Sequence, residues 1–191
     1  MCIQVYIGSD KELPLVEWNE KWDEEGAILV QKFDYNSYDD DKFAEETLQK
    51  EYKYHVSCWQ GCGCGFGFND EITDDMHRVY TKQSIIEAAE AAFGSIDEAD
   101  SVYKGILGGS ILDGLNGEPA GNTYTKENRR NKQSVEALFE YIRANVEGNC
   151  ELLSFWGGDR EIKSRDVIDL KNFVMGNKFH FESVQHITVY T

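Results

Sequence analysis

The alternation of apolar and polar residues is strongest in residues 52–68, which read YKYHVSCWQGCGCGFGF. Side chains of a β-strand point alternately to the two faces of a sheet, so a period of two predicts strands at 52–58 and 62–68. A short loop that contains a glycine joins them, which is typical of a β-hairpin. In that register Cys58 faces Cys62, and one face of the hairpin is wholly apolar and belongs to the core.

On the opposite face of the predicted hairpin, the strand at 52–58 carries polar side chains and the strand at 62–68 carries only glycines. Glycine inside a strand is costly and usually stands where another backbone or a ligand comes close. One interpretation is a neighbouring helix or loop packed flat on the glycines. The other is a shallow binding site, because polar groups that converge in a depression mark a ligand site. Its candidate ligand-binding residues are His55, Ser57, Gly63, Gly65 and Gly67.

The same kind of pattern predicts the other elements. Alternation and β-branched content predict strands at 2–8, 27–33, 150–156, 178–181 and 186–190. Helical spacing of apolar residues predicts short helical segments at 43–52 and 164–170, and two main helices at 84–93 and 125–146 that cover one face of the sheet. With no internal repeat visible, these elements predict one α+β domain over residues 1–191, with a mostly antiparallel sheet and the 52–68 hairpin at its centre.

A glycine-rich segment at about residues 94–124 breaks this regularity. It has apolar residues but little periodicity, which predicts an irregular stretch. Because long irregular segments in compact domains are often functional, we expect it to be a second contact region, beside the glycine face of the hairpin.

Composition narrows the classes of partner. The chain has 35 acidic and 19 basic residues, a net charge of -16, so nucleic acid is excluded as a partner because phosphate binding needs concentrated Lys and Arg. The acidity serves solubility or attracts a basic protein, as in immunity proteins, an analogy of charge and size only. No apolar run approaches the roughly 20 residues of a membrane span, and the N-terminus lacks a secretion signal, so we expect a cytoplasmic protein.

Thiols supply the main candidate chemistry. Five cysteines without an export signal predict reduced thiols in a reducing compartment. His55, Cys58, Cys62 and Cys64 offer four soft donors within ten residues, enough for a zinc site. Their spacing is irregular, and an extended strand points His55 and Cys58 to opposite faces. A Cys58–Cys62 disulfide and buried thiols that act as small apolar groups are the other interpretations.

Two stretches carry a resemblance. CIQVYIGSD at residues 2–10 and GCGCGF at residues 61–66 resemble stretches of a group of small bacterial proteins of unknown function. The resemblance implies a bacterial cytoplasmic origin and no particular activity.

No arrangement of catalytic residues is visible, since the four histidines are scattered and no nucleophile elbow occurs. The sequence therefore favours a non-enzymatic binding protein without a cofactor. The alternatives are a thiol- or metal-dependent protein that uses the cluster around His55, and an acidic immunity-type protein that binds a basic partner.

Overall fold

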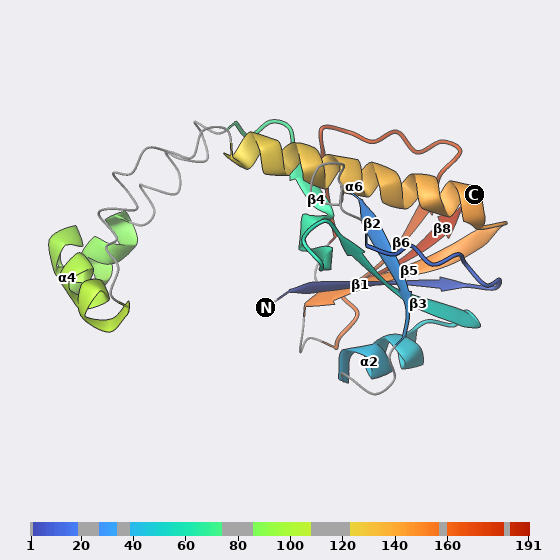
Figure 1. The fold of residues 1–191 in the computed structure, drawn as a ribbon, viewed down its shortest axis with the longest axis horizontal. Helices are drawn as coiled ribbons and strands as arrows, with labels where there is room; N and C mark the ends of the chain where they lie inside the picture. The colour runs from blue at the N-terminus through green and yellow to red at the C-terminus, as the bar shows by residue number, and fades with distance from the viewer. Residues whose placement is uncertain are drawn as a thin grey trace. The chain divides into compact units, whose positions relative to one another are not determined.

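The structure is a computed structural model, and it describes residues 2–18, 27–33, 39–73, 86–107, 123–156, 160–181 and 184–191. The chain forms two compact units. Unit 1 joins Met1–Asp70 to Asn128–Thr191, and unit 2 comprises Glu71–Glu127. Unit 1 holds the sheet (Figure 1), so it carries the mostly antiparallel α+β fold that the alternation predicts. The sequence predicts one domain and does not indicate that residues 71–127 form a compact unit of their own.

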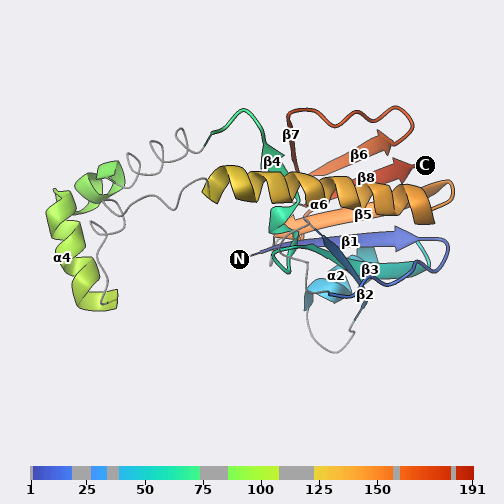
Figure 2. The same ribbon diagram turned by 45° about the horizontal axis from the view of Figure 1, so that its top comes forward.

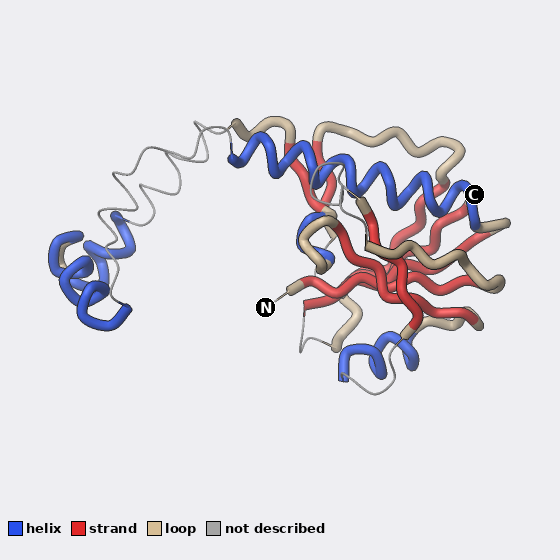
Figure 3. The backbone as a smooth tube through the Cα atoms, in the orientation of Figure 1, coloured by secondary structure: helices blue, strands red, loops and turns tan. Residues whose placement is uncertain are grey.

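The main sheet has six strands in the order β2-β3-β1-β5-β8-β6. Their bounds are β1 Ile3–Ser9, β2 Ile28–Lys32, β3 Tyr52–Cys58, β5 Asn149–Trp156, β6 Ser164–Asp169 and β8 Gln185–Tyr190. All neighbours pair antiparallel except β6 and β8, which are parallel. Five of these strands, all except β6, lie within one residue of where the alternation predicts them. The prediction of helical turns at 164–170 was wrong, because the chain there forms the edge strand β6 (Figure 3).

The predicted hairpin is corrected by the strand pairing. The first strand, β3, has the predicted bounds, but it pairs with β1 and β2 rather than with residues 62–68. After a turn at 59–61 the chain forms a 3₁₀ turn, η1 at Gly63–Gly65, and the short strand β4 at Gly67–Asn69. β4 pairs with β7, Lys178–His180, in a separate two-stranded sheet. A strand with alternate glycines offers little to pack, so the branched side chains of β1 are the better partner.

The two faces of the main sheet are covered by different helices (Figure 2). Helix α6, Thr123–Asn145, packs Val135, Leu138 and Ile142 on the face that carries the alternate residues Val5 and Ile7 of β1. The predicted 125–146 helix is thus confirmed. The buried side chains of the opposite face are Tyr6, Phe33, Ala44, Leu48, Leu153, Phe155 and Val184.

That second face is covered by α2, Asp39–Thr47, which begins four residues before the predicted start at residue 43. Its first turn carries Asp40 and Asp41, whose negative charge is favourable at a helix N-terminus. The Tyr6 hydroxyl donates to Asp41 Oδ1 at 2.7 Å, which ties the helix to β1.

Unit 2 contains helices at residues 86–93 and 96–107. Residues 86–93 form a helix that ends at Gly94, as predicted, where a φ of +83° requires the freedom of glycine. Residues 96–107 form α4, Ile96–Leu107, so the prediction of an irregular stretch at 94–124 was wrong there. The missed signal is a capping box, since Ser95 Oγ accepts from the backbone N–H of Glu98 at 3.2 Å. Residues 108–122 lie outside the described residues.

Whether the 84–93 helix covers the face of the sheet, as predicted, stays a prediction, because that helix belongs to unit 2. Among the described residues, no helix combines the length and the apolar character that crossing a membrane requires.

Candidate functional site

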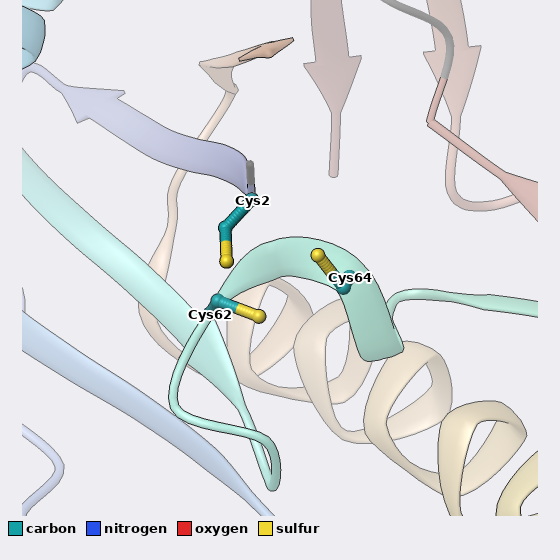
Figure 4. A group of neighbouring side chains, drawn as sticks. All are labelled: Cys2, Cys62 and Cys64. Atoms are coloured by element: carbon teal, nitrogen blue, oxygen red, sulfur yellow. The ribbon is translucent and has the colours of Figure 1, made fainter. Parts of the chain in front are cut away.

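Three cysteines converge where β1 begins. The sulfur atoms of Cys2, Cys62 and Cys64 all lie within 4.8 Å of one another. Figure 4 shows the three side chains gathered between the start of β1 and the turn that contains η1. Cys2 is exposed, and the other two are half-buried. Two segments sixty residues apart therefore bring three thiols together at a site that solvent reaches.

Glycines set the position of this turn. A Cβ at Gly63 would lie 2.6 Å from Val5 Cγ2 and 2.9 Å from the carbonyl oxygen of Ile3. A Cβ at Gly65 would lie 2.4 Å from Cys58 Sγ. Real Cβ atoms do not approach so closely, so the backbone can lie against β1 and β3 only because residues 63 and 65 have no side chains.

Backbone N–H groups point at the sulfur atoms of the turn. The N–H of Ile3 donates to Cys64 Sγ at 3.3 Å. Burial raises the pKa of Cys62 to about 12, although a hydrogen bond from the backbone of Cys64 lowers it. With a pKa so far above neutrality, Cys62 is a thiol at pH 7. A metal ion would displace its proton, because thiolates are the form that binds metals.

Cys58 lies at the inner end of the same turn. It is fully buried, and burial raises the pKa of its thiol. The N–H of Gln60 donates to its sulfur at 3.4 Å, and the backbone of Cys58 donates to the carbonyl of Cys62 at 2.9 Å. All five cysteines are free thiols, so the alternative of a Cys58–Cys62 disulfide is not formed in this structure.

Helix α6 holds the turn through the side chains of Asn131 and Arg130. Asn131 Nδ2 donates to the carbonyl oxygen of Gly67 at 2.8 Å, and its Oδ1 accepts from Trp59 Nε1, also at 2.8 Å. The guanidinium of Arg130 lies 5.1 Å from the centre of the Trp59 ring, in a cation–π contact. The two ends of the turn are thus fastened to one point of the helix.

The remaining predicted site residues lie elsewhere. His55 points to the other face of the sheet, where its Nε2 is 3.0 Å from Gln4 Oε1 and burial lowers its pKa. It therefore does not join the cysteines. Ser57 is buried, and Gly67 lies opposite His180 in the small sheet. The positions above Gly63 and Gly65 are filled by protein atoms, which agrees with the packing interpretation of the glycines.

The sequence pattern does not identify Cys2 as a member of the thiol cluster. Cys2 stands in no local motif with Cys62 or Cys64, and only the pairing of β1 with β3 places it beside them. The resemblance of the CIQVYIGSD stretch at residues 2–10 implies no role for Cys2.

A second cluster of titratable groups is structural. His186 Nε2 lies 3.2 Å from Glu151 Oε1, and its Nδ1 lies 3.1 Å from Arg165 Nη1. Since arginine only donates, Nδ1 is the acceptor and Nε2 carries the proton. The backbone N–H groups of Gln49 and Lys50 donate to Glu151 Oε2 at 2.7 and 3.2 Å. These contacts fasten β5 and β8 to the chain before β3.

The fold and this site define an α+β protein with three thiols converging at a partly exposed turn. Comparisons with protein-family models, with curated proteins and with solved structures give no match. The resemblance of the two sequence stretches to small bacterial proteins therefore stays a prediction.

Proposed function

We propose that this protein binds a thiophilic metal ion through Cys2, Cys62 and Cys64. The observation that carries the proposal is the mutual approach of their three sulfur atoms within 4.8 Å. Thiolates are the soft ligands that select zinc, monovalent copper and iron–sulfur clusters over harder ions such as magnesium. Cysteines that served only as small apolar groups would be buried, whereas Cys2 is exposed and the others are half-buried.

The proposed role of the ion is structural and non-enzymatic. The ion would join the start of β1 to the turn at residues 59–67, two segments that are otherwise connected there through the Ile3 to Cys64 hydrogen bond and the contacts of Gly63. Metal binding to such a site contributes directly to the free energy of unfolding. The free thiols favour a reducing compartment, so we also propose that the protein is located in the cytoplasm.

The negative net charge supports a second proposal, that the partner of this protein is a basic protein. A net charge of -16 speeds association with a basic protein, and the rate falls with added salt because exposed charges are screened beyond about 8 Å at physiological ionic strength. A pull-down from a bacterial lysate at low salt tests this point. If no discrete basic protein is recovered, the negative charge serves solubility alone.

A competition titration tests the metal proposal. The reduced protein, kept free of oxygen, is titrated with zinc against a chromophoric chelator. We expect one zinc ion per chain, and at least a 100-fold loss of affinity in the Cys62→Ser/Cys64→Ser variant. The control is Cys150→Ser, which changes a buried thiol outside the cluster and leaves the affinity unchanged. Equal zinc affinity in all three proteins would refute the proposal.

A further inference from the structure

We infer that this cluster is also a site of oxidation, at which Cys2 and Cys64 form a disulfide bond. The bond would remove two of the three proposed metal ligands, so the centre would hold its ion only while its thiols are reduced. The disulfide itself is independent of metal binding, whereas the release of the ion rests on the proposed function.

Two backbone segments are already in contact where this bond would form. The N–H of Ile3 donates to Cys64 Sγ at 3.3 Å, so this sulfur lies beside the peptide group that joins Cys2 to Ile3. Gly63 lies against the same segment, since a Cβ there would be 2.9 Å from the carbonyl oxygen of Ile3. A disulfide requires backbones held at close range, and these contacts hold the start of β1 against the turn.

The two sulfur atoms that would be joined are also close. They lie within 4.8 Å of each other, and Figure 4 shows their side chains reaching into the same space from the start of β1 and from η1. A sulfur–sulfur bond is about 2.05 Å long. Rotation about the Cα–Cβ bonds between staggered rotamers moves a sulfur atom through a distance comparable to the remaining gap, so the backbone can keep its place.

Cys64 is a better partner for Cys2 than Cys62 is, although all three sulfur atoms are mutually close. The Cys64 sulfur is the one that accepts the Ile3 N–H and so lies at the backbone of Cys2. A bond between Cys62 and Cys64 would join two residues of one turn. The Cys2–Cys64 bond instead links segments about sixty residues apart, and the stabilisation from a disulfide grows with the length of the loop that it closes.

Exposure selects Cys2 as the thiol that meets an oxidant. Cys2 is exposed, whereas Cys58 and Cys150 are buried. Oxidation of thiols follows their exposure, and cysteines that sense oxidants often have a second cysteine nearby that resolves the first product. Cys64, which is half-buried beside Cys2, has the position of such a resolving thiol.

With hydrogen peroxide as the oxidant, the reaction is balanced by the release of two water molecules. The sulfur of Cys2 attacks one oxygen of the peroxide, the O–O bond breaks, and Cys2 becomes a sulfenic acid while the first water leaves. The sulfur of Cys64 then attacks the sulfur of Cys2, the S–O bond breaks, and the second water leaves. The two thiols lose two protons and two electrons in all, and the peroxide takes up both.

Oxidation would dismantle the metal site because the thiolate is the form of cysteine that binds a metal ion. The disulfide leaves Cys62 as the one free thiol of the cluster, which is too few ligands for the four-coordinate sites that zinc prefers. Reduction of the disulfide restores the three thiols, since disulfides form and break reversibly by exchange.

Disulfide mapping in the metal-free full chain tests the inference. The reduced protein is treated with one equivalent of hydrogen peroxide in the presence of a chelator, its remaining thiols are alkylated after unfolding, and its peptides are analysed by mass spectrometry without reduction. We expect one Cys2–Cys64 disulfide within each chain, with Cys58, Cys62 and Cys150 alkylated. A Cys62–Cys64 disulfide, a disulfide between two chains or no disulfide at all would overturn the inference.

Serine variants provide matched controls. Cys64→Ser should abolish the disulfide at Cys2, whereas Cys62→Ser, the same substitution in the same turn, should form it as the wild type does. Cys150→Ser, which changes a buried thiol outside the cluster, should also leave it unchanged. Equal yields in Cys62→Ser and Cys64→Ser would contradict the assignment of Cys64. If Cys64→Ser does not fold, the fragment spectra of the wild-type disulfide-linked peptide decide between the two cysteines.

Zinc release separates this inference from the proposed function. The zinc-loaded chain is treated with hydrogen peroxide beside a chromophoric chelator, and we expect one zinc ion to be released for each disulfide formed and to rebind after reduction with a phosphine. A Cys2–Cys64 disulfide in a chain that binds no zinc would refute the proposed function and leave the disulfide standing. Zinc binding without any disulfide on oxidation would refute the inference and leave the proposed function standing.

Discussion

At the residue scale, the site depends on positions where a side chain has no room. The alternation of cysteine and glycine at residues 62–65 points the thiols toward Cys2 and the bare Cα atoms toward β1 and β3. Gly63 and Gly65, two of the glycines that the sequence singled out, are therefore required for this close packing of the backbone. The sequence could mark them as unusual but could not show what lies against them.

Replacing Gly65 with alanine tests this packing. The new Cβ would lie 2.4 Å from Cys58 Sγ and 3.0 Å from Asn131 Oδ1, so we expect the free energy of unfolding to fall by about 1–3 kcal/mol. Urea denaturation measures the change. Gly176→Ala is the control, because nothing lies within 4 Å of its Cβ position. Adding Cys58→Ala to Gly65→Ala should recover part of the loss, and a strictly additive double variant would contradict the account.

The buried carboxylate of Glu151 gives a prediction about pH. Burial is the largest influence and raises its pKa, but His186 and the N–H groups of Gln49 and Lys50 together outweigh it, so the pKa is lowered. A folded pKa below the unfolded value stabilises the protein above about pH 5, and this stability is lost as the pH falls through the folded pKa.

We expect Glu151→Gln to lower the free energy of unfolding by roughly 1–2 kcal/mol at pH 7, because a neutral acceptor replaces a charged one. The difference from wild type should shrink as the pH falls from about 5, above the ordinary pKa of a glutamate side chain, through the lowered pKa of the folded carboxylate. Denaturation curves at a series of pH values measure both effects. A constant difference across that range would mean that the charge of Glu151 does not stabilise the fold.

At the scale of elements, the structure shows which patterns can be predicted locally. The bounds of β3 follow from its own alternation, and α6 follows from its own apolar face. The pairing partner of β3 cannot be predicted from β3 alone. Residues 62–68 and β1, which lies about fifty residues earlier, are both possible partners, and β3 pairs with β1. The convergence of Cys2 with the turn is a consequence of that pairing. Local sequence therefore indicated a cluster of thiols but not that Cys2 belongs to it.

The contact between the turn and α6 is also a matter of elements, and Asn131→Ala tests it. The variant loses the hydrogen bonds to Trp59 Nε1 and to the carbonyl of Gly67, so we expect a loss of about 1–3 kcal/mol. Trp59 fluorescence should report a more exposed indole, and zinc affinity should fall. Asn172→Ala removes an exposed hydrogen bond to Asp169 and is the control. Equal stability of the two variants would show that α6 does not hold the turn.

At the scale of the whole molecule, unit 2 is an insertion whose ends meet in unit 1. The backbone N–H of Asn69 donates to Asn128 Oδ1 at 2.7 Å, and Asn128 Nδ2 donates to Asp70 Oδ1 at 3.2 Å. Lys132 forms an ion pair with the same aspartate. The main sheet and its two covering helices lie in unit 1, apart from the first turn of α6.

A chain in which a short Gly/Ser linker replaces residues 73–125 should therefore keep the fold of unit 1. Insertions between ends that lie close together are tolerated, and their removal leaves the core intact. We expect one cooperative unfolding transition and one bound zinc ion per chain. Loss of cooperative unfolding would mean that unit 1 needs unit 2 for its stability.

The most direct test of the metal centre is site-resolved thiol alkylation with and without zinc. In the presence of a chelator, peptide mass spectrometry should find Cys2, Cys62 and Cys64 alkylated in the folded protein, whereas the buried Cys58 and Cys150 react only after unfolding. One equivalent of zinc should protect the three reactive cysteines together. Alkylation of Cys2, Cys62 and Cys64 at the same rate with zinc as without it would contradict the account.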